Sequence, residues 1–221
     1  IVIPTRLAST RLPRKALADI GGVPMILRVV HRALQSGLGT VVVAAGDQEI
    51  LDAVSGIANV RGVLTESALA SGSDRVHAAL EQIDPQRDHD VVINLQGDLP
   101  LIDPTTLHNV LEPLKLPGFD IGTLAAPVMN IEERDAASVV KIACSFENSH
   151  VARALYFSRQ VLPWGEGEHW HHVGVYAWRR AALARFVSLP SSALERRESL
   201  EQLRAREAGG DSDCRIGVER I

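Results

Sequence analysis

The sequence has little cysteine, no excess of positive charge and no long hydrophobic run. Two cysteines, Cys144 and Cys214, are too few for a disulfide framework and fit a reducing cytoplasm; we expect both to be structural residues and not nucleophiles. The 23 lysine and arginine residues are outnumbered by 27 aspartate and glutamate residues, which disfavours a nucleic-acid partner. No apolar run approaches the roughly 18–20 residues that span a bilayer, so we expect no membrane association.

What remains is the composition of a globular protein. The 221 residues are 46% hydrophobic and 23% charged, and this length allows one large α/β domain or two small ones. No signal peptide is apparent, and the chain begins at Ile1 without a methionine, so we expect its natural start to lie upstream.

Short apolar runs alternate with amphipathic stretches in the first half of the chain. Val41–Ala45 is an unbroken apolar run, which is typical of a strand buried on both faces, and Asp103-Pro104 predicts a helix start. We expect strands at Ile1–Ile3, Val41–Ala45, Val60–Thr65 and Val91–Leu95, and helices at about Pro24–Gln35, Gln48–Ile57, Asp74–Ile83 and Asp103–Leu114. This alternation without hairpin turns predicts right-handed crossovers and a mainly parallel sheet.

The pattern changes after about Asp120, where strands follow one another with little helix between them. We expect strands at Ile121–Val128, Val139–Ser145, Ala154–Ser158 and Val173–Trp178, followed by helices at about Arg179–Val187 and Leu194–Glu207. The sequence therefore predicts a single domain, 1–221, in which a partly antiparallel lobe, 120–178, is inserted between an α/β half, 1–119, and closing helices, 179–221.

A basic loop follows the first predicted strand. It carries Arg6, Arg11, Arg14 and Lys15, and no acidic residue precedes Asp19. Open α/β sheets bind ligands at the carboxyl ends of their strands, so these cations are suited to a polyphosphate. The loop is neither a GxxxxGK[ST] nor a GxGxxG motif. Charge alone does not distinguish a phosphate-binding loop from a solvated basic loop. The position of the loop directly after a strand favours phosphate binding.

Two polar loops follow in the same half. Asp98 comes directly after a buried strand, where a carboxylate beside a glycine suits Mg²⁺, and Gln96 has an amide that can contact a base or a sugar hydroxyl. The alternative is that Asp98 only caps a turn. In the other loop, Ser71 or Ser73 is suited to cap a helix, and the same backbone amides can hold a base or a phosphate.

Candidate ligand residues also occur in the second half. Arg159 follows a predicted strand and can bind a carboxylate through two hydrogen bonds. His169, His171 and His172 do not predict a zinc site, because strand alternation sends His171 and His172 to opposite faces and no ligand stands at zinc spacing.

The last predicted helix carries a polar face. Glu198, Glu201 and Gln202 share this face at spacings i, i+3 and i+4. A solvated charged face is the usual explanation for such a run.

Six segments together resemble the 3-deoxy-manno-octulosonate (Kdo) cytidylyltransferase family, and they occur in one order along essentially the whole chain. They are Pro4–Lys15, Ser71–Arg75, Asn94–Asp98, Ala154–Arg159, His172–Tyr176 and Leu200–Arg204. The resemblance implies a Rossmann-like nucleotide-diphospho-sugar transferase fold with a mainly parallel central sheet and an inserted, partly antiparallel lobe. It also implies a cytoplasmic, Mg²⁺-dependent homodimer that transfers a cytidylyl group from CTP to Kdo, giving CMP-Kdo and pyrophosphate for lipopolysaccharide synthesis.

The resemblance also implies roles for individual residues. Those matching the nucleotide site are Arg6, Arg11, Lys15, Ser71, Gly72, Ser73, Arg75 and Gln96. Those matching the sugar site are Gln96, Arg159, His172, Tyr176, Glu201 and Gln202. Asp98 matches a Mg²⁺ ligand and, with Arg11 and Lys15, acts in catalysis, while Arg159 matches the partner of the Kdo carboxylate. We expect the nucleotide site in 1–119 and the sugar site and two-fold contact in the 120–178 lobe.

Three departures accompany this resemblance. Leu99 stands where the family often has glutamate, and Arg14 stands where it usually has glycine, which adds charge but loses backbone freedom. The family continues to a Gly-Val-Asp-Thr segment whose aspartate is a second metal ligand, and no such segment occurs up to Ile221. The alternatives are a cytidylyltransferase for another acidic sugar, such as 8-amino-Kdo or a sialic acid, and a non-catalytic nucleotide-binding paralogue.

Overall fold

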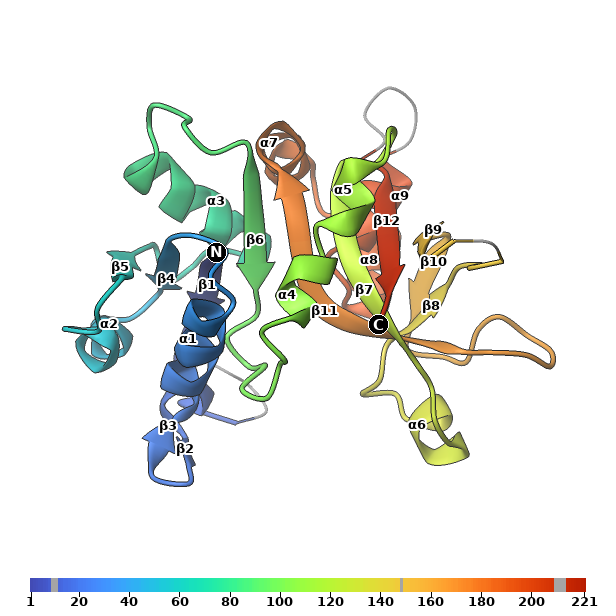
Figure 1. Ribbon diagram of the computed structural model, residues 1–221, viewed down its shortest axis with the longest axis horizontal. Coiled ribbons are helices and arrows are strands. Elements are labelled where there is room, and N and C mark those ends of the chain that lie inside the picture. The colour runs from blue at the N-terminus through green and yellow to red at the C-terminus, as the bar shows by residue number, and fades with distance from the viewer. Residues whose placement is uncertain (9–11, 148, 209–213) are drawn as a thin grey trace. The chain divides into compact units, whose positions relative to one another are not determined.

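The structure is a computed structural model that describes residues 1–8, 12–147, 149–208 and 214–221 (Figure 1). The chain forms two compact units, Ile1–His108 and Asn109–Ile221, which are described in turn. The expectation of a single domain stays a prediction. Among the described helices, none has both the length and the apolar character needed to cross a bilayer.

The first unit contains a parallel sheet with the strand order β5-β4-β1-β6. Its strands are β1 (Val2–Thr5), β4 (Val41–Ala45), β5 (Val60–Leu64) and β6 (Val91–Leu95). The connecting helices are α1 (Met25–Gln35), α2 (Gln48–Val54) and α3 (Gly72–Ile83). These elements confirm the predicted strand–helix alternation, and they bring the carboxyl ends of β1 and β6 to the same edge of the sheet.

Burial explains why these segments were recognisable. Every residue of β4 is buried, as its unbroken apolar run predicts, and α1 presents one apolar face, including Ile26 and Val30, to the interior. Truncating a fully buried isoleucine of this kind to alanine costs about 2–5 kcal/mol. Two smaller features follow β1: a 3-10 helix η1 (Lys15–Leu17), and a hairpin of β2 (Asp19–Ile20) and β3 (Val23–Pro24).

The helix predicted at about Asp103–Leu114 is wrong as a continuous element. Two short helices occupy this stretch, α4 (Thr106–Asn109) and α5 (Glu112–Lys115). Asp103 caps a turn, because its Oδ1 accepts hydrogen bonds from the Thr105 amide and hydroxyl, both at 2.8 Å. Pro113 lies near the start of α5, where its missing amide hydrogen is tolerated. A proline inside a longer helix would lack the hydrogen bond that continues it.

The second unit contains a mixed sheet, which confirms the predicted partly antiparallel character. β7 (Ile121–Pro127) pairs antiparallel with β11 (Trp170–Arg179) and parallel with β12 (Ile216–Arg220), and β12 pairs antiparallel with β9 (Val151–Arg153). β8 (Lys141–Ala143) pairs antiparallel with β10 (Tyr156–Ser158) and β11. The sequence predictions missed β9, β12 and the short helix α6 (Ile131–Asp135), and the strand predicted at Ala154–Ser158 corresponds to β10 alone.

Two helical predictions near the end of the chain have different outcomes. Helix α7 (Arg180–Ser188) is close to its prediction, but the helix predicted at Leu194–Glu207 is two helices, α8 (Ala193–Glu198) and α9 (Leu203–Glu207). The break occurs because Ser199 adopts a left-handed conformation with φ 56°. Glu198, Glu201 and Gln202 therefore do not share a helical face.

Candidate functional site

The basic loop and Asp98 meet at the carboxyl edge of the first unit's sheet. The Lys15 Nζ lies 2.7 Å from the Asp98 Oδ2, and the two side chains are 38% and 49% exposed. Close approach of the β6 loop to β1 requires a small residue, since a Cβ on Gly97 would lie 3.1 Å from the Pro4 carbonyl oxygen. This edge therefore presents a cation and a carboxylate together, both open to solvent.

Two contacts fix the start and the end of the basic loop. The Leu7 amide donates a hydrogen bond of 2.8 Å to the Asp47 Oδ2. Arg14 adopts φ 58°, the conformation that glycine takes most easily, and its guanidinium pairs with Glu49. Arg14 thus occupies a position that needs a left-handed backbone, which is where the replacement of glycine was expected to reduce backbone freedom. Sequence reasoning missed Asp47 because nothing local links it to this loop.

The arginines predicted for the nucleotide have different surroundings. Arg6 is exposed, and its Nη1 lies 3.5 Å from the Leu69 carbonyl oxygen, which places it beside the Ser71 loop. Arg11 lies outside the described residues. Arg75 is buried and donates to Glu66 O at 3.0 Å, Ser67 O at 3.3 Å and the Thr65 hydroxyl. Arg75 therefore organises the 65–67 segment, and direct contact with a nucleotide stays a prediction.

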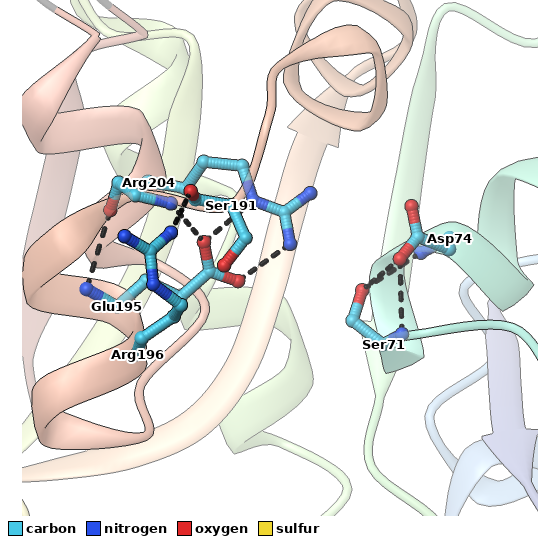
Figure 2. Close-up of polar contacts among 7 residues, drawn as sticks. Ser71, Asp74, Ser191, Glu195, Arg196 and Arg204 are labelled. Carbon is cyan, nitrogen blue, oxygen red and sulfur yellow. Dashed lines mark hydrogen bonds and ion pairs between the residues drawn. The ribbon is translucent and has the colours of Figure 1, made fainter.

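Ser71 caps helix α3, as predicted. Its Oγ accepts from the Asp74 amide at 3.2 Å, while the Asp74 Oδ2 accepts from the Ser71 amide at 3.0 Å and from its hydroxyl at 2.8 Å (Figure 2). This reciprocal arrangement fixes the polar loop at the helix N-terminus. The Ser71 side chain is thus already engaged, so a ligand here would meet the backbone amides of the first helical turn.

Gln96 lies against this loop. A Cβ on Gly72 would be 3.5 Å from both terminal atoms of the Gln96 amide. The Gln96 Nε2 donates to the buried Asn94 Oδ1 at 3.0 Å, and the Asn94 Nδ2 lies 3.5 Å from the Ser73 Oγ. One N–H of Gln96 is thus used, and its second N–H and its carbonyl oxygen are suited to contact a ligand.

The predicted sugar residues other than Gln96 belong to the second unit. Among them, Arg159 is held by main-chain groups. Its Nε donates to the Glu198 carbonyl oxygen and its Nη1 to the Ala137 carbonyl oxygen, each at 3.0 Å. Nη2 makes no hydrogen bond with any residue that the structure describes. Arg159 thus has a fixed orientation and one terminal nitrogen available for an anion.

His172 is buried at the centre of an aromatic cluster. Its ring lies 5.0 Å from Phe157 and 5.4 Å from Tyr176, measured between ring centres. Its Nε2 is 2.9 Å from the Thr123 Oγ1, whose single proton is donated to the Val175 carbonyl oxygen at 2.8 Å. With the Thr123 proton assigned to this carbonyl, the His172 Nε2 is the donor to Thr123 and Nδ1 is left as an acceptor.

Burial controls the protonation of this cluster. It lowers the pKa of His172 to about 3, with a smaller contribution from His171, so the ring is neutral at physiological pH. Burial, with the nearby charge of Glu201, raises the pKa of Tyr176. His171 lies on the opposite face of β11, where its Nδ1 is 3.0 Å from the Glu133 Oε1, which confirms the predicted alternation. The partner of His172, Thr123, could not be predicted from sequence because it comes from strand β7.

Glu201 and Gln202 occupy the turn between α8 and α9. Gln202 is 3% exposed, and its Nε2 has no hydrogen-bond partner among the described residues. An unpartnered buried donor is costly, which makes it a candidate for contact with a ligand. The flanking helices are tied by a nearly buried pair: the Arg204 Nη2 and Nε lie 2.6 and 2.9 Å from the two Glu195 carboxylate oxygens (Figure 2).

Two chemical features limit the reactions that these residues can perform. Burial raises the pKa of the Cys144 thiol to about 12, consistent with the structural role predicted for it. Within the described ranges, no three His, Cys, Asp or Glu side chains form a group that could hold a metal ion. A single carboxylate together with phosphate oxygens and water is a donor set that Mg²⁺ commonly takes.

The fold is that of the nucleotide-diphospho-sugar transferases, and the match to a family model makes the protein a nucleotidyltransferase. A solved structure of UDP-glucose pyrophosphorylase with UDP-glucose aligns with 100% of this chain and 90% of its own at 11% identity and a TM-score of 0.65, which shows the nucleotide-diphospho-sugar transferase fold. The chain belongs to the cytidylyltransferase family, whose model matches residues 1–219.

Individual relatives narrow this family. The 3-deoxy-manno-octulosonate cytidylyltransferase of Parvibaculum lavamentivorans is 56% identical over 209 residues, covering 95% of this chain and 81% of the relative. That of Rhodopseudomonas palustris (strain HaA2) is 52% identical over 216 residues, covering 98% and 88%. A solved structure of CMP:2-keto-3-deoxy-manno-octonic acid synthetase complexed with CTP is 35% identical, with a TM-score of 0.86 over 100% of this chain and 88% of that one.

Proposed function

We propose that the protein transfers a cytidylyl group from CTP to the anomeric hydroxyl of Kdo, giving CMP-Kdo and pyrophosphate. The observation that carries this assignment is the 56% identity to a 3-deoxy-manno-octulosonate cytidylyltransferase over nearly the whole chain. The geometry supports it, because the first unit presents cations and a carboxylate at a sheet edge and the second unit holds a braced arginine among buried polar groups.

The first unit holds the nucleotide. Arg6, Arg11 and Lys15 neutralise the triphosphate, and Lys15 stabilises the charge that develops on the departing pyrophosphate. The amides at the start of α3 and the Gln96 carbonyl oxygen supply polar contacts for the rest of the nucleotide. The exposure of Lys15 supports this role, since its ammonium can reach a ligand without unfolding the sheet edge.

Mg²⁺ fits the donor set at Asp98 and is proposed as the cofactor. The carboxylate has two oxygens, of which Oδ2 faces Lys15, so Oδ1 can serve as a metal ligand. When bound there, the ion supplies positive charge to the phosphate oxygens and lowers the pKa of the sugar hydroxyl. Asp98 holds this charge in place, and Lys15 orients Asp98.

The second unit holds the acidic sugar. The Arg159 guanidinium binds the Kdo carboxylate, while the His172 Nδ1 accepts a hydrogen bond and the Gln202 Nε2 donates one to sugar hydroxyls. Tyr176 and Glu201 complete the polar surroundings. Because the pKa of His172 is about 3, this ring orients the sugar and does not act as a base at neutral pH.

The reaction is an in-line substitution without a covalent enzyme intermediate. The anomeric oxygen forms a bond to the α-phosphorus, the bond from this phosphorus to the bridging oxygen of the β-phosphate breaks, and the hydroxyl proton passes to water. The protein contributes positioning and charge stabilisation.

A pyrophosphate-release assay tests this function. With CTP and Mg²⁺, we expect release with Kdo to exceed release with 8-amino-Kdo and sialic acids, and we expect EDTA to abolish it. A higher kcat/KM for another acidic sugar would reassign the substrate. CTP binding in calorimetry without release from any sugar would instead support a non-catalytic nucleotide-binding protein.

We also propose that the protein is a cytoplasmic homodimer. Met129 and Ile131 support the dimer, since they are apolar residues of the second unit that are 78% and 64% exposed. Light scattering after size exclusion should give twice the mass of the chain; a monomeric mass at micromolar concentration would refute the dimer. Fractionation of the producing cell would test the location.

A further inference from the structure

Lys141 is a fully buried lysine that the proposed chemistry leaves without a role. It lies on strand β8 with no exposed surface. Its Nζ donates to three carbonyl oxygens, those of Ala136 at 2.9 Å, Val139 at 2.7 Å and Arg159 at 2.7 Å. An ammonium has three N–H groups, so this one is fully used by the main chain.

The same segment is held by a second cation. Arg159 donates through Nη1 to the Ala137 carbonyl oxygen, so the carbonyls of residues 136, 137 and 139 are shared between the two side chains. The other side of Arg159 is fixed by α8, because its amide donates to the Glu198 Oε2 at 3.1 Å and its Nε to the Glu198 carbonyl oxygen. Lys141 thus binds both the main chain of Arg159 and the segment that orients its guanidinium.

The position of Lys141 is costly for a lysine. Burial lowers the pKa of Lys141, and the charge of Asp135 opposes this shift. An apolar side chain would suit the interior of β8, but it would remove the ammonium donor from three carbonyl groups, of which Ala136 would keep a hydrogen bond of 3.1 Å from the Val139 amide. The ammonium therefore acts by holding the three main-chain carbonyl groups in place around it.

We propose that Lys141 is a positioning residue for the acidic substrate, which sets the direction of the Arg159 guanidinium. It does so by fixing residues 136–139 and the Arg159 main chain, so that Nη2 is left for the substrate carboxylate. This role rests on the proposed function, since it requires Arg159 to bind an acidic sugar. Lys141 itself does not touch the substrate.

Steady-state kinetics of Lys141→Met provide the first test. We expect the KM for Kdo to rise by about tenfold or more while the KM for CTP stays within about twofold, because only the interaction of Arg159 with the Kdo carboxylate is weakened. Lys115→Met is the matched control: its ammonium is on the surface, 2.6 Å from the Glu112 Oε1, and all constants should stay at wild-type values. A folded Lys141→Met enzyme with an unchanged KM for Kdo would overturn the role.

A second readout separates positioning from general stability. Wild-type enzyme should have a higher kcat/KM for Kdo than for its carboxamide, and Lys141→Met should reduce this ratio. A merely structural defect would lower kcat/KM for both substrates by the same factor. In an Arg159→Ala background, Lys141→Met should raise the KM for Kdo no further. Additive effects in this double-mutant cycle would contradict an action through Arg159.

Lys141→Gln guards against a loss of folding, because its amide keeps two N–H donors for the three carbonyls. It should give a smaller rise in the KM for Kdo than Lys141→Met. If neither variant folds, Lys141 serves stability alone and the positioning role is refuted. If wild-type enzyme itself does not use Kdo, the proposed function fails first, so the two failures are distinguishable.

Discussion

The two units present their candidate ligand residues in opposite ways. In the first unit, Lys15 and Asp98 are 38% and 49% exposed; Lys15 begins the 3-10 helix η1 and Asp98 lies in the turn after β6. In the second unit, His172 and Gln202 are 7% and 3% exposed and are enclosed by packed side chains. Under the proposed function, we therefore expect the nucleotide to be held mainly through charge and the sugar through fixed hydrogen bonds. Substitutions in the first unit should change activity without unfolding the protein, while those in the second should change both.

Asp98→Asn should have the largest effect on activity. We expect kcat to fall by roughly 100-fold or more because the metal loses its carboxylate, while CTP affinity and the thermal midpoint stay near wild-type values. Pyrophosphate release, calorimetry and thermal melting measure the three quantities. Asp88→Asn, at an exposed aspartate of the same unit, is the matched control. Near-normal turnover in a Mg²⁺-dependent assay would rule out Asp98 as the ligand.

Glu195→Gln should show the contrasting behaviour in the second unit. Breaking its nearly buried pair with Arg204 should lower the free energy of unfolding by about 3 kcal/mol and loosen the 199–202 turn. Urea unfolding measures this loss. Glu49→Gln breaks the exposed pair with Arg14 and should cost much less, because solvent screens an exposed ion pair. Equal costs for the two variants would contradict the comparison between the units.

Acid should weaken the Glu195 pair in a defined direction. Burial raises the pKa of Glu195, but hydrogen bonds from Arg204 and Ser192 outweigh it and hold the pKa below its usual value. The stabilisation is therefore present above about pH 4.5 and is lost as the pH falls through the folded pKa. Wild-type protein should lose more stability on acidification than Glu195→Gln in chemical unfolding; parallel losses would refute this.

His172 should add a second pH dependence. Its folded pKa of about 3 lies below the ordinary value of 6.5, so the unfolded state binds the proton more readily. Stability from the neutral ring is complete above about pH 6.5 and declines toward pH 3. His172→Phe keeps an aromatic ring and should remove this part of the decline in unfolding measurements. A wild-type curve that matches the variant between these limits would contradict a buried neutral histidine.

Arg14→Gly should have the smallest effect. Glycine relieves the left-handed backbone at this position, and this gain offsets the small loss of the exposed, solvent-screened pair with Glu49. The thermal midpoint and turnover should both remain close to wild type. A large loss of stability in melting experiments would show that this pair does more than anchor a loop.

Local patterns predicted the first unit well and the second unit less well. The β4 strand and the α1 helix have strong periodicity, and burial followed it. The break at Ser199 has no local signal, since a serine with a left-handed backbone looks like any other serine in a helical run. The lysine at 141 within an apolar stretch was a visible signal of a buried charge, but its three carbonyl partners depend on how distant segments pack.

The candidate site was predicted in a similarly uneven way. The proximity of the basic loop and Asp98 followed from the parallel order of β1 and β6. The capping role of Ser71 followed from its position before a helix. The partners of His172 and Arg159 did not, because Thr123 and Glu198 reach them only through tertiary packing.

The most direct test is phosphorus NMR of one tube that contains enzyme, CTP, Mg²⁺ and Kdo. We predict that the triphosphate resonances disappear while a phosphodiester resonance of CMP-Kdo and the resonance of pyrophosphate grow in equal amounts. An unchanged CTP spectrum at catalytic enzyme concentration, or the appearance of phosphate without a phosphodiester, would contradict cytidylyl transfer to Kdo.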